Sequence, residues 1–275
     1  AELTDAKTIN YSVELIDVTV KTGDGLLGTV TETKKYSVTL DKDYVLSSYM
    51  AVPEGGELTL NLNGHKLYAN NTAVFTAEKK KTTVSINGEV DGSSIIAANY
   101  PVFINYCADN SKLTVKGGSY FGSYGFIFYA TDNATASCEF DNITVDARDA
   151  GLWLSNCAIT SGIIKDSDIT AGDVGIYAGT FKNGVDGKYA LTISNTIVNA
   201  GNTGIEIKSG DVLIQNSTIG SKNYKDDSTE INSNGSGAGV AALAINNGYV
   251  GTTNARSVNV KVEGTTITNE VSSTP

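Results

Sequence analysis

Histidine, tryptophan, arginine and proline are scarce in this chain of 275 residues. The single histidine, His65, leaves no His-containing metal motif, and no Gly-x-Ser-x-Gly nucleophile elbow occurs, so two frequent catalytic signatures are excluded. With three prolines and a charged fraction of 18%, the sequence fits neither a proline-rich stalk nor a highly charged disordered chain. A hydrophobic content of 40% indicates a folded protein.

Positive charge and long apolar runs are lacking too. The net charge is −10 and the only basic cluster is the run 79–81, whereas binding to nucleic-acid phosphates requires a basic patch. No stretch approaches the roughly 18 consecutive apolar residues of a membrane span. We therefore expect neither a nucleic-acid partner nor direct insertion into a membrane. The chain stops in VSSTP directly after a strand-like run, which we interpret as the boundary of a fragment.

One short pattern recurs along the chain. Its first copy, within LTLNLNGHKLYA from Leu58, reads apolar residue, any residue, a Gly, Asn or Asp, two more residues, then apolar, any, small. The third position holds the residues that enter left-handed backbone conformations at least cost, which predicts a sharp bend in every copy. These structural turns are Gly64, Gly88, Gly117, Asn142, Asp166, Asn195, Asn216 and Gly264.

The spacing of these bends predicts the fold. By subtraction they lie 24, 29, 25, 24, 29, 21 and 48 residues apart, and self-similarity at such a period is the signature of a solenoid. Each period holds at least two β runs and no helical pattern. We predict an all-β, single-stranded parallel β-helix of about eight to nine coils, right-handed because crossovers between parallel strands are overwhelmingly of that hand.

The repeat divides the chain into two parts. Residues 1–57 do not carry it, and since a solenoid must cover its terminal rung, we interpret them as an N-terminal β cap with an incomplete first coil. Residues 58–275 form the predicted β-helix. A loop inserted at about 221–238, together with the stretch 246–256, explains the last and longest interval between bends.

The run VTLDKDYVLSSYMAVPEGGELTLNLNGHKLYA, residues 38–69, resembles the opening of bacterial cell-surface proteins with a right-handed parallel β-helix, the fold shared with pectate lyases. The resemblance implies a secreted or surface-attached bacterial protein. It covers residues 38–69 closely and the later coils by pattern. It says little about activity, because this superfamily contains lyases, hydrolases, phage tailspikes, adhesins and inert stalks.

A second β run follows each bend, and its alternation predicts which side chains face the core. The cysteines fit this arrangement as core or corner residues. Cys107 and Cys157 fall in the same slot two coils apart, too far for a disulfide, and Cys138 aligns with inward positions, so we expect three free thiols. The predicted inward positions of the second runs are Val102, Phe126, Leu152, Ile176 and Ile205.

The residues between these inward positions form an outward stripe, which is the main candidate binding site. Exposed apolar stripes usually mark contact surfaces. Three interpretations stay open: cover by residues 1–57 or a terminal segment, a protein interface that includes a homo-oligomer, and stacking against sugar rings. The members of the stripe are Phe75, Phe103, Ile127, Trp153 and Tyr177, with Tyr100 and Tyr124 aligned at the neighbouring corner.

Acidic residues supply the only catalytic or metal-binding alternative. Asp146 and Asp149, with Asp166 and Asp168 on the next coil, are carboxylates that could hold calcium, and Arg148 could serve a uronate carboxylate. The pectate lyases that the chain resembles use a basic residue beside calcium-binding carboxylates. A lyase builds its cleft from long loops, however, and most corners here are short. We expect no catalytic residue and no cofactor, with these aspartates as weak calcium candidates.

These observations predict a non-catalytic extracellular module of a secreted or surface-attached bacterial protein. It would act in adhesion, in binding of a glycan or a protein at the cell surface, or as a spacer. A polysaccharide lyase or glycoside hydrolase acting on acidic polysaccharide is the first alternative. A phage tailspike or virion fibre is the second, because it would share the fold and the acidic surface. Turnover of a polyuronate would favour the first alternative, and trimerisation the second.

Overall fold

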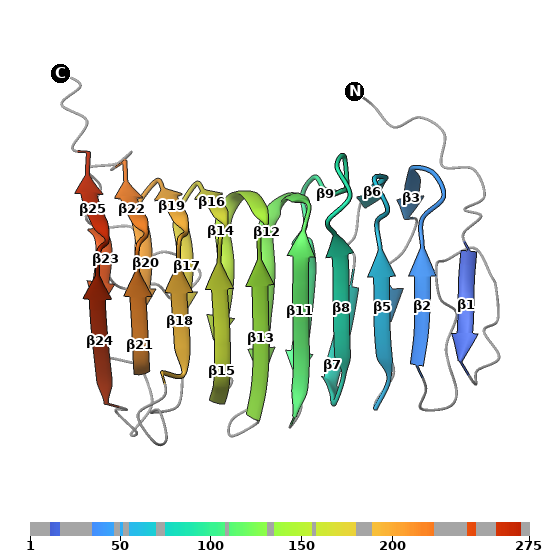
Figure 1. Ribbon diagram of the computed structural model, residues 1–275, viewed down its shortest axis with the longest axis horizontal. Helices are drawn as coiled ribbons and strands as arrows, with labels where there is room; N and C mark the ends of the chain where they lie inside the picture. Colours follow the sequence, from blue (N-terminus) through green and yellow to red (C-terminus); the bar gives the residue numbers. More distant parts are fainter. Residues whose placement is uncertain are drawn as a thin grey trace.

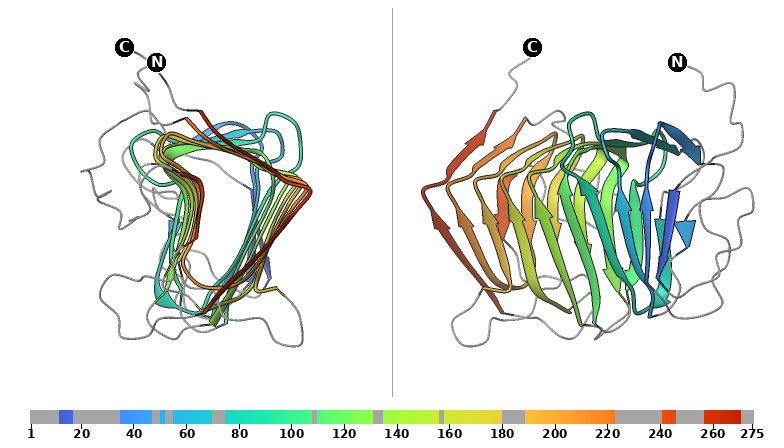
Figure 2. Two further views of the ribbon diagram at one scale, coloured as in Figure 1. Left: turned by 90° about the vertical axis from the view of Figure 1, so that its left-hand side faces the viewer. Right: turned by 45° about the vertical axis from the view of Figure 1, so that its right-hand side comes forward.

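The computed structural model shows a parallel β-solenoid (Figure 1). Strands far apart in the sequence lie side by side along the long axis, and the view along that axis shows the chain winding around a common centre (Figure 2). The predicted all-β parallel fold is confirmed. The structure describes residues 12–16, 35–46, 50–51, 55–69, 75–107, 110–130, 135–155, 158–179, 189–222, 241–245 and 257–270, and no helix occurs among them.

Each coil contributes strands to three faces, which we number in chain order. Face 1 is a 10-stranded sheet in which every strand after the first pair runs parallel to its neighbours. Its order is β1 (Ser12–Ile16), β2 (Lys35–Thr39), β5 (Glu57–Asn61), β8 (Thr83–Gly88), β11 (Ser111–Gly117), β13 (Thr135–Asp141), β15 (Ala158–Lys165), β18 (Leu191–Ser194), β21 (Gly210–Gln215) and β24 (Val258–Glu263).

Faces 2 and 3 belong to one 15-stranded sheet, because β12 (Ser119–Ala130) and β14 (Thr144–Ser155) run through the corner between them. Face 2 also contains β3 (Tyr44–Leu46), β6 (Lys66–Ala69), β9 (Ser94–Ala97), β16 (Asp168–Ala171), β19 (Ile197–Ala200), β22 (Thr218–Ser221) and β25 (Thr266–Asn269). Face 3 also contains β4 (Met50–Ala51), β7 (Phe75–Lys80), β10 (Phe103–Cys107), β17 (Val174–Ala178), β20 (Thr203–Ile207) and β23 (Ala241–Ile245).

Alternation of side chains produces a continuous core inside the three faces. On face 1, for example, Leu58, Val84, Leu113 and Cys138 follow one another in register with exposures of 0–3%. Stacking of equivalent residues at the strand spacing buries apolar surface along the whole axis. Cys138 is a free, buried thiol, as predicted. The side chain of Cys107 and all of Cys157 lie outside the described residues.

The register of face 3 differs by one residue from the predicted register at β10. Phe103, rather than Val102, pairs with Phe126, and both phenylalanines are 0% exposed. Phe103 is therefore a core residue and not part of an outward stripe, which corrects the prediction. The Phe126 ring lies 6.0 Å from the Phe103 ring, 5.0 Å from Tyr120 and 5.3 Å from Phe140, centroid to centroid. Burial raises the pKa of the Tyr120 hydroxyl, which donates to the Gly117 carbonyl at 2.8 Å.

Left-handed backbone occurs at most of the predicted bends. Gly88 is the exception, because it ends β8 inside the sheet, and a Cβ there would lie 2.9 Å from the Cα of Gly118. The close approach of two coils explains this glycine, and the left-handed turn of that coil is at Gly92, with φ of 87°. Seven predicted bends have φ between 48° and 82°: Gly64, Gly117, Asn142, Asp166, Asn195, Asn216 and Gly264.

Hydroxyl and amide side chains satisfy the backbone at these bends. Ser167 Oγ donates to the Lys165 carbonyl at 2.7 Å and accepts from the Ile143 N–H of the preceding coil at 3.2 Å. Asn195 Nδ2 donates to Asp166 Oδ1 at 3.0 Å, so a side-chain amide also bonds along the stack. Such bonds matter because an unpaired buried backbone group is costly. Hydroxyls that also donate to the carbonyl two residues earlier are those of Thr196, Ser217 and Thr265.

Winding begins before the first copy of the repeat. The strands β2, β3 and β4 lie on faces 1, 2 and 3, in register with β5, β6 and β7. β1 pairs antiparallel with β2 at the end of face 1. Of the predicted insertions, residues 223–238 and 246–256 lie outside the described residues, and β23 on face 3 lies between them. The domain boundary at residue 57 and the right-handed winding stay predictions.

Candidate binding site

The outer side of face 3 carries part of the predicted stripe. Parallel pairing sets Ile127, Trp153, Tyr177 and Glu206 next to one another on four successive coils. We call these four residues the covered column. Alternation placed them correctly on the outer side because their neighbours in each strand point into the core.

The covered column is packed and not bare. The rings of Trp153 and Tyr177 are stacked, with centroids 3.9 Å apart and 4° between the planes, and Tyr124 meets Trp153 edge-on at 6.4 Å. Trp153 is only 8% exposed and Tyr177 only 3%. With Ala150 and Val174 they form a second hydrophobic cluster outside the main core. These two rings are therefore not accessible for stacking against a sugar in this structure.

A buried ion pair ends the covered column. Lys208 Nζ lies 3.3 Å from Glu206 Oε1, and the residues are 4% and 0% exposed. The same Nζ lies 5.3 Å from the centroid of the Tyr177 ring, within the range of a cation–π contact. Removing two charges from water is costly, and only their mutual attraction and further hydrogen bonds compensate for it. Removal of one of the two charges alone should therefore destabilise this cluster.

The remaining members of the predicted stripe lie elsewhere. Phe103 is in the core, and Phe75 pairs with it in the register of β7, with a side chain outside the described residues. Tyr100 is 42% exposed, whereas Tyr124 is partly buried. Their corners are adjacent as predicted, since the Ser123 N–H donates to the Tyr100 carbonyl at 3.0 Å.

Acidic side chains lie at the corner beside the covered column. Burial raises the pKa of the Tyr124 hydroxyl, and its hydrogen bond to Asp149 and the charges of Asp149 and Asp173 raise it further. Tyr124 is therefore protonated at neutral pH and acts as a donor. Asn202 Nδ2 donates to Asp173 Oδ1 at 2.8 Å. These carboxylates are engaged in hydrogen bonds between neighbouring coils.

Face 2 carries a second outward column that the sequence analysis did not identify. Val45, Tyr68, Ile96 and Phe121 follow one another in register on four successive coils, and Asp146 occupies the same position on the fifth. Phe121 is 37% exposed, and the other three apolar side chains are partly exposed. We call Val45, Tyr68, Ile96 and Phe121 the exposed column. It is the accessible apolar stripe that face 3 was expected to provide.

Arg148 lies beside the exposed column. Its Nη1 donates to Asn99 Oδ1 at 3.2 Å. Asn99 follows Ile96 and lies two coils before Arg148, so the arginine side chain crosses the coil that carries Phe121. Both partners of this hydrogen bond are exposed, and the adjacent Tyr100 is 42% exposed. Aromatic surface, an amide and a guanidinium with five N–H donors thus meet at one corner.

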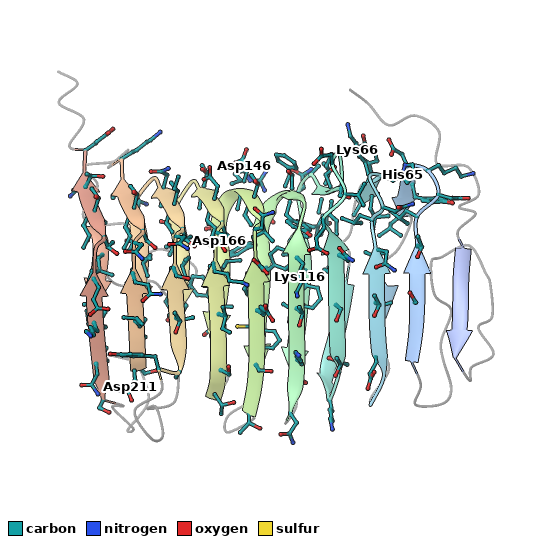
Figure 3. All side chains as sticks on the ribbon, in the orientation of Figure 1. His65, Lys66, Lys116, Asp146, Asp166 and Asp211 are labelled. Atoms are coloured by element: carbon teal, nitrogen blue, oxygen red, sulfur yellow. The ribbon has the colours of Figure 1, made fainter. Side chains whose placement is uncertain are left out.

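The aspartates considered as calcium ligands do not come together. Asp146 is on the outer side of face 2, Asp166 forms a bend with φ of 52°, and Asp149 bonds to Tyr124 at the next corner. Asp168 is exposed on β16. Figure 3 shows Asp146 and Asp166 at separate places on the solenoid. Within the described residues, no group of three or more His, Cys, Asp or Glu side chains could hold a metal ion.

The repeat itself contained a signal for the exposed column. Two of its members, Tyr68 in LYA and Phe121 in YFG, occupy the position between the apolar and the small residue at the end of a copy. The pattern leaves that position unrestricted, and later copies hold polar residues or glycine there. In a sheet with one solvated face, polar residues are expected on the outer side. Aromatic residues at this position in the early copies therefore indicate a contact surface. The later residues at this position are Asp146, Thr170, Asn199, Gly220 and Thr268.

Comparison with known proteins finds no relative of this chain: no family model, no curated protein and no solved structure matches it. The described residues contain no helix that is long and apolar enough to cross a membrane. What the chain does must therefore be inferred from its own residues and geometry.

Proposed function

We propose that this chain is a non-catalytic, glycan-binding module of a secreted or surface-attached bacterial protein, and that the exposed column is its binding site. The supporting observation is the row of Tyr68, Ile96 and Phe121 on the outer side of face 2, with Arg148 and Asn99 at the adjacent corner. The resemblance of residues 38–69 to bacterial cell-surface proteins supports the extracellular setting.

An extended glycan fits this surface in shape and in chemistry. Aromatic and aliphatic side chains offer apolar surface to the C–H faces of sugar rings. Coils repeat about every 4.8 Å, so a linear ligand lying along the axis would contact several of them in turn. Arg148 offers N–H donors to hydroxyl or carboxylate groups, and Asp146 offers acceptors to hydroxyls. A glycan that contains uronate residues would use the aromatic and the charged groups together.

The solenoid holds these side chains in place before any ligand arrives. Tyr68, Ile96 and Phe121 stand on β6, β9 and β12, and each of these strands pairs with a neighbour on both sides. Little ordering of the backbone is therefore needed on binding, which favours affinity. The covered column stabilises the adjoining face and takes no part in the contact.

Replacement of Phe121 by alanine should weaken glycan binding about ten-fold or more, because loss of a central aromatic contact typically removes at least 1–2 kcal/mol of binding free energy. The Arg148→Ala variant should lose affinity for uronate-containing oligosaccharides and keep affinity for neutral ones. Isothermal titration calorimetry of residues 1–275 with a panel of neutral oligosaccharides and oligogalacturonides measures both effects.

Thr170→Ala is the matched control, because Thr170 occupies the same outward position two coils beyond Phe121 and is exposed. It should bind as the parent does, and all three variants should keep the parent's stability within about 0.5 kcal/mol. Equal binding by folded Phe121→Ala and parent protein would place the site elsewhere. Release of unsaturated products from the uronates in the presence of calcium would support a lyase instead.

A further inference from the structure

The charged side chains around the exposed column change sign along the solenoid axis. Asp43, two residues before Val45, is exposed at the first coil of the column, and its Oδ1 accepts the Lys66 N–H at 2.9 Å. On the fifth coil Asp146 is exposed and takes the column's own position. Carboxylates therefore lie at both ends of the exposed column.

A lysine lies between these two ends. Lys66 is exposed on β6 two residues before Tyr68, so alternation places both on the outer side of face 2 at the second coil. On the next two coils the position of Lys66 is taken by Ser94 and Ser119. Lys66 and Asp146 lie along the same edge of the solenoid, with the coils of β9 and β12 between them (Figure 3).

Arg148 supplies a second cation to the middle of the column, although its backbone belongs to the fifth coil. The register between β12 and β14 shifts here, so that Arg148 and Asp149 both lie opposite Ser123 in a β-bulge. Bulges change the direction in which a side chain points. The guanidinium reaches back across the fourth coil, where its Nη1 donates to Asn99 Oδ1 at 3.2 Å. Positive charge is thus placed in the middle of the exposed column and negative charge at its ends.

We propose that the exposed column binds a heteropolysaccharide in which single uronate residues are separated by neutral sugars, and that it discriminates against a chain of uronates alone. The inference rests on the proposed function and specifies its ligand. A carboxylate over the middle of the column would be attracted by Lys66 and Arg148. Neutral sugars would lie beside Asp43 and Asp146, where a continuous polyuronate would place further carboxylates. Specificity of this kind uses repulsion as well as attraction.

The charges are close enough together for this effect. Coils repeat about every 4.8 Å, and the screening length is about 8 Å at physiological ionic strength, so a carboxylate over one coil interacts with charges on the next. Each pair of exposed charges contributes little, and only their sum gives a useful preference. The preference should therefore decrease at high salt.

Isothermal titration calorimetry of residues 1–275 with three hexasaccharides tests the proposal. They consist of glucuronate alternating with N-acetylglucosamine, of galacturonate alone and of N-acetylglucosamine alone. The alternating chain should bind about ten-fold more tightly than either of the others. Asp146→Asn should reduce its advantage over hexagalacturonate about three-fold, because one repulsive charge is removed. Lys66→Gln and Arg148→Gln should each reduce its advantage over the neutral chain about three-fold.

Glu139→Gln is the matched control, because it also replaces a carboxylate by an amide but lies on β13 of face 1. It should leave both ratios unchanged. An alternating chain that binds no more tightly than either of the other two overturns the inference. If Phe121→Ala still abolishes binding in that case, the proposed function stands. Absence of binding by all three hexasaccharides, or binding that Phe121→Ala leaves unchanged, contradicts the proposed function and this inference with it.

Discussion

Replacement of Gly151 by valine should prevent the solenoid from folding. Gly151 lies at the corner between faces 2 and 3, where a Cβ atom would be 2.5 Å from the Gly175 carbonyl oxygen and 2.5 Å from Ile169 Cγ2. Real Cβ atoms do not approach backbone this closely, so the adjacent coil would have to move. A valine adds two more methyl groups to this collision, and movement of one coil disturbs the register of those stacked on it.

The same constraint recurs on successive coils. A Cβ on Gly125 would lie 2.4 Å from the Gly151 carbonyl oxygen, one on Gly175 would lie 2.5 Å from that of Gly204, and one on Gly204 would lie 2.4 Å from that of Ala242. The four glycines form a column in which each backbone packs directly on the next. Glycine is required here for close approach, and none of these four needs a left-handed φ.

A graded series measures this effect. Gly151→Ala should lower the free energy of unfolding in urea by about 1–3 kcal/mol, and Gly151→Val should yield little soluble folded protein. Thr170→Val is the control, since it places a valine at an exposed position of β16. Parent-like stability of Gly151→Ala would show that the coils at this corner are not in the proposed contact.

Replacement of Lys208 by methionine should cost about 3–5 kcal/mol of the free energy of unfolding, because it removes the cation that lies beside the buried carboxylate of Glu206. The two residues are 4% and 0% exposed, and Lys208 Nζ lies 3.3 Å from Glu206 Oε1. Methionine has a similar length and volume, so the loss reports on the charge of Lys208, including its position 5.3 Å from the centroid of the Tyr177 ring, and not on volume. Urea denaturation measures it.

The double variant Glu206→Gln/Lys208→Met separates charge from packing. Removing both charges should recover most of the lost stability, because neither side chain then needs an ionic partner. The single variant Glu206→Gln should be destabilised as well, through loss of the ion pair with the buried ammonium of Lys208. If Lys208→Met proved as stable as the parent protein, the pair would not be held in the buried geometry described for the covered column.

The fold could be predicted from the sequence because the pattern that produces it occurs eight times. A bend residue followed by an apolar-any-small ending recurs at a solenoid period, and no tertiary information is needed to detect it. The register of individual coils was harder to predict from the sequence than the fold. An error of one residue in a strand exchanges inner and outer side chains. Phe103 was assigned to the outer side of face 3 because the prediction aligned Val102, and not Phe103, with Phe126.

The candidate site was harder to predict than the fold. Alternation correctly placed Ile127, Trp153 and Tyr177 on the outer side of face 3, but an outward side chain is exposed only if nothing packs over it. The alternation of apolar and polar residues does not show whether other groups pack over an outward side chain. The exposed column was missed for the opposite reason, since Tyr68 and Phe121 stand at a repeat position that is polar in later copies. Comparison of that position across coils would have identified them.

Fluorescence of the single tryptophan tests the assignment of the two columns most directly. Because Trp153 is 8% exposed and stacked on Tyr177, its emission in the free protein should be blue-shifted and weakly quenched by acrylamide, and it should not change when an oligosaccharide binds. Unfolding in urea should shift the emission to the red. A red-shifted, readily quenched emission in the native protein that changes on glycan binding would contradict the account, since the sugar would then lie on face 3.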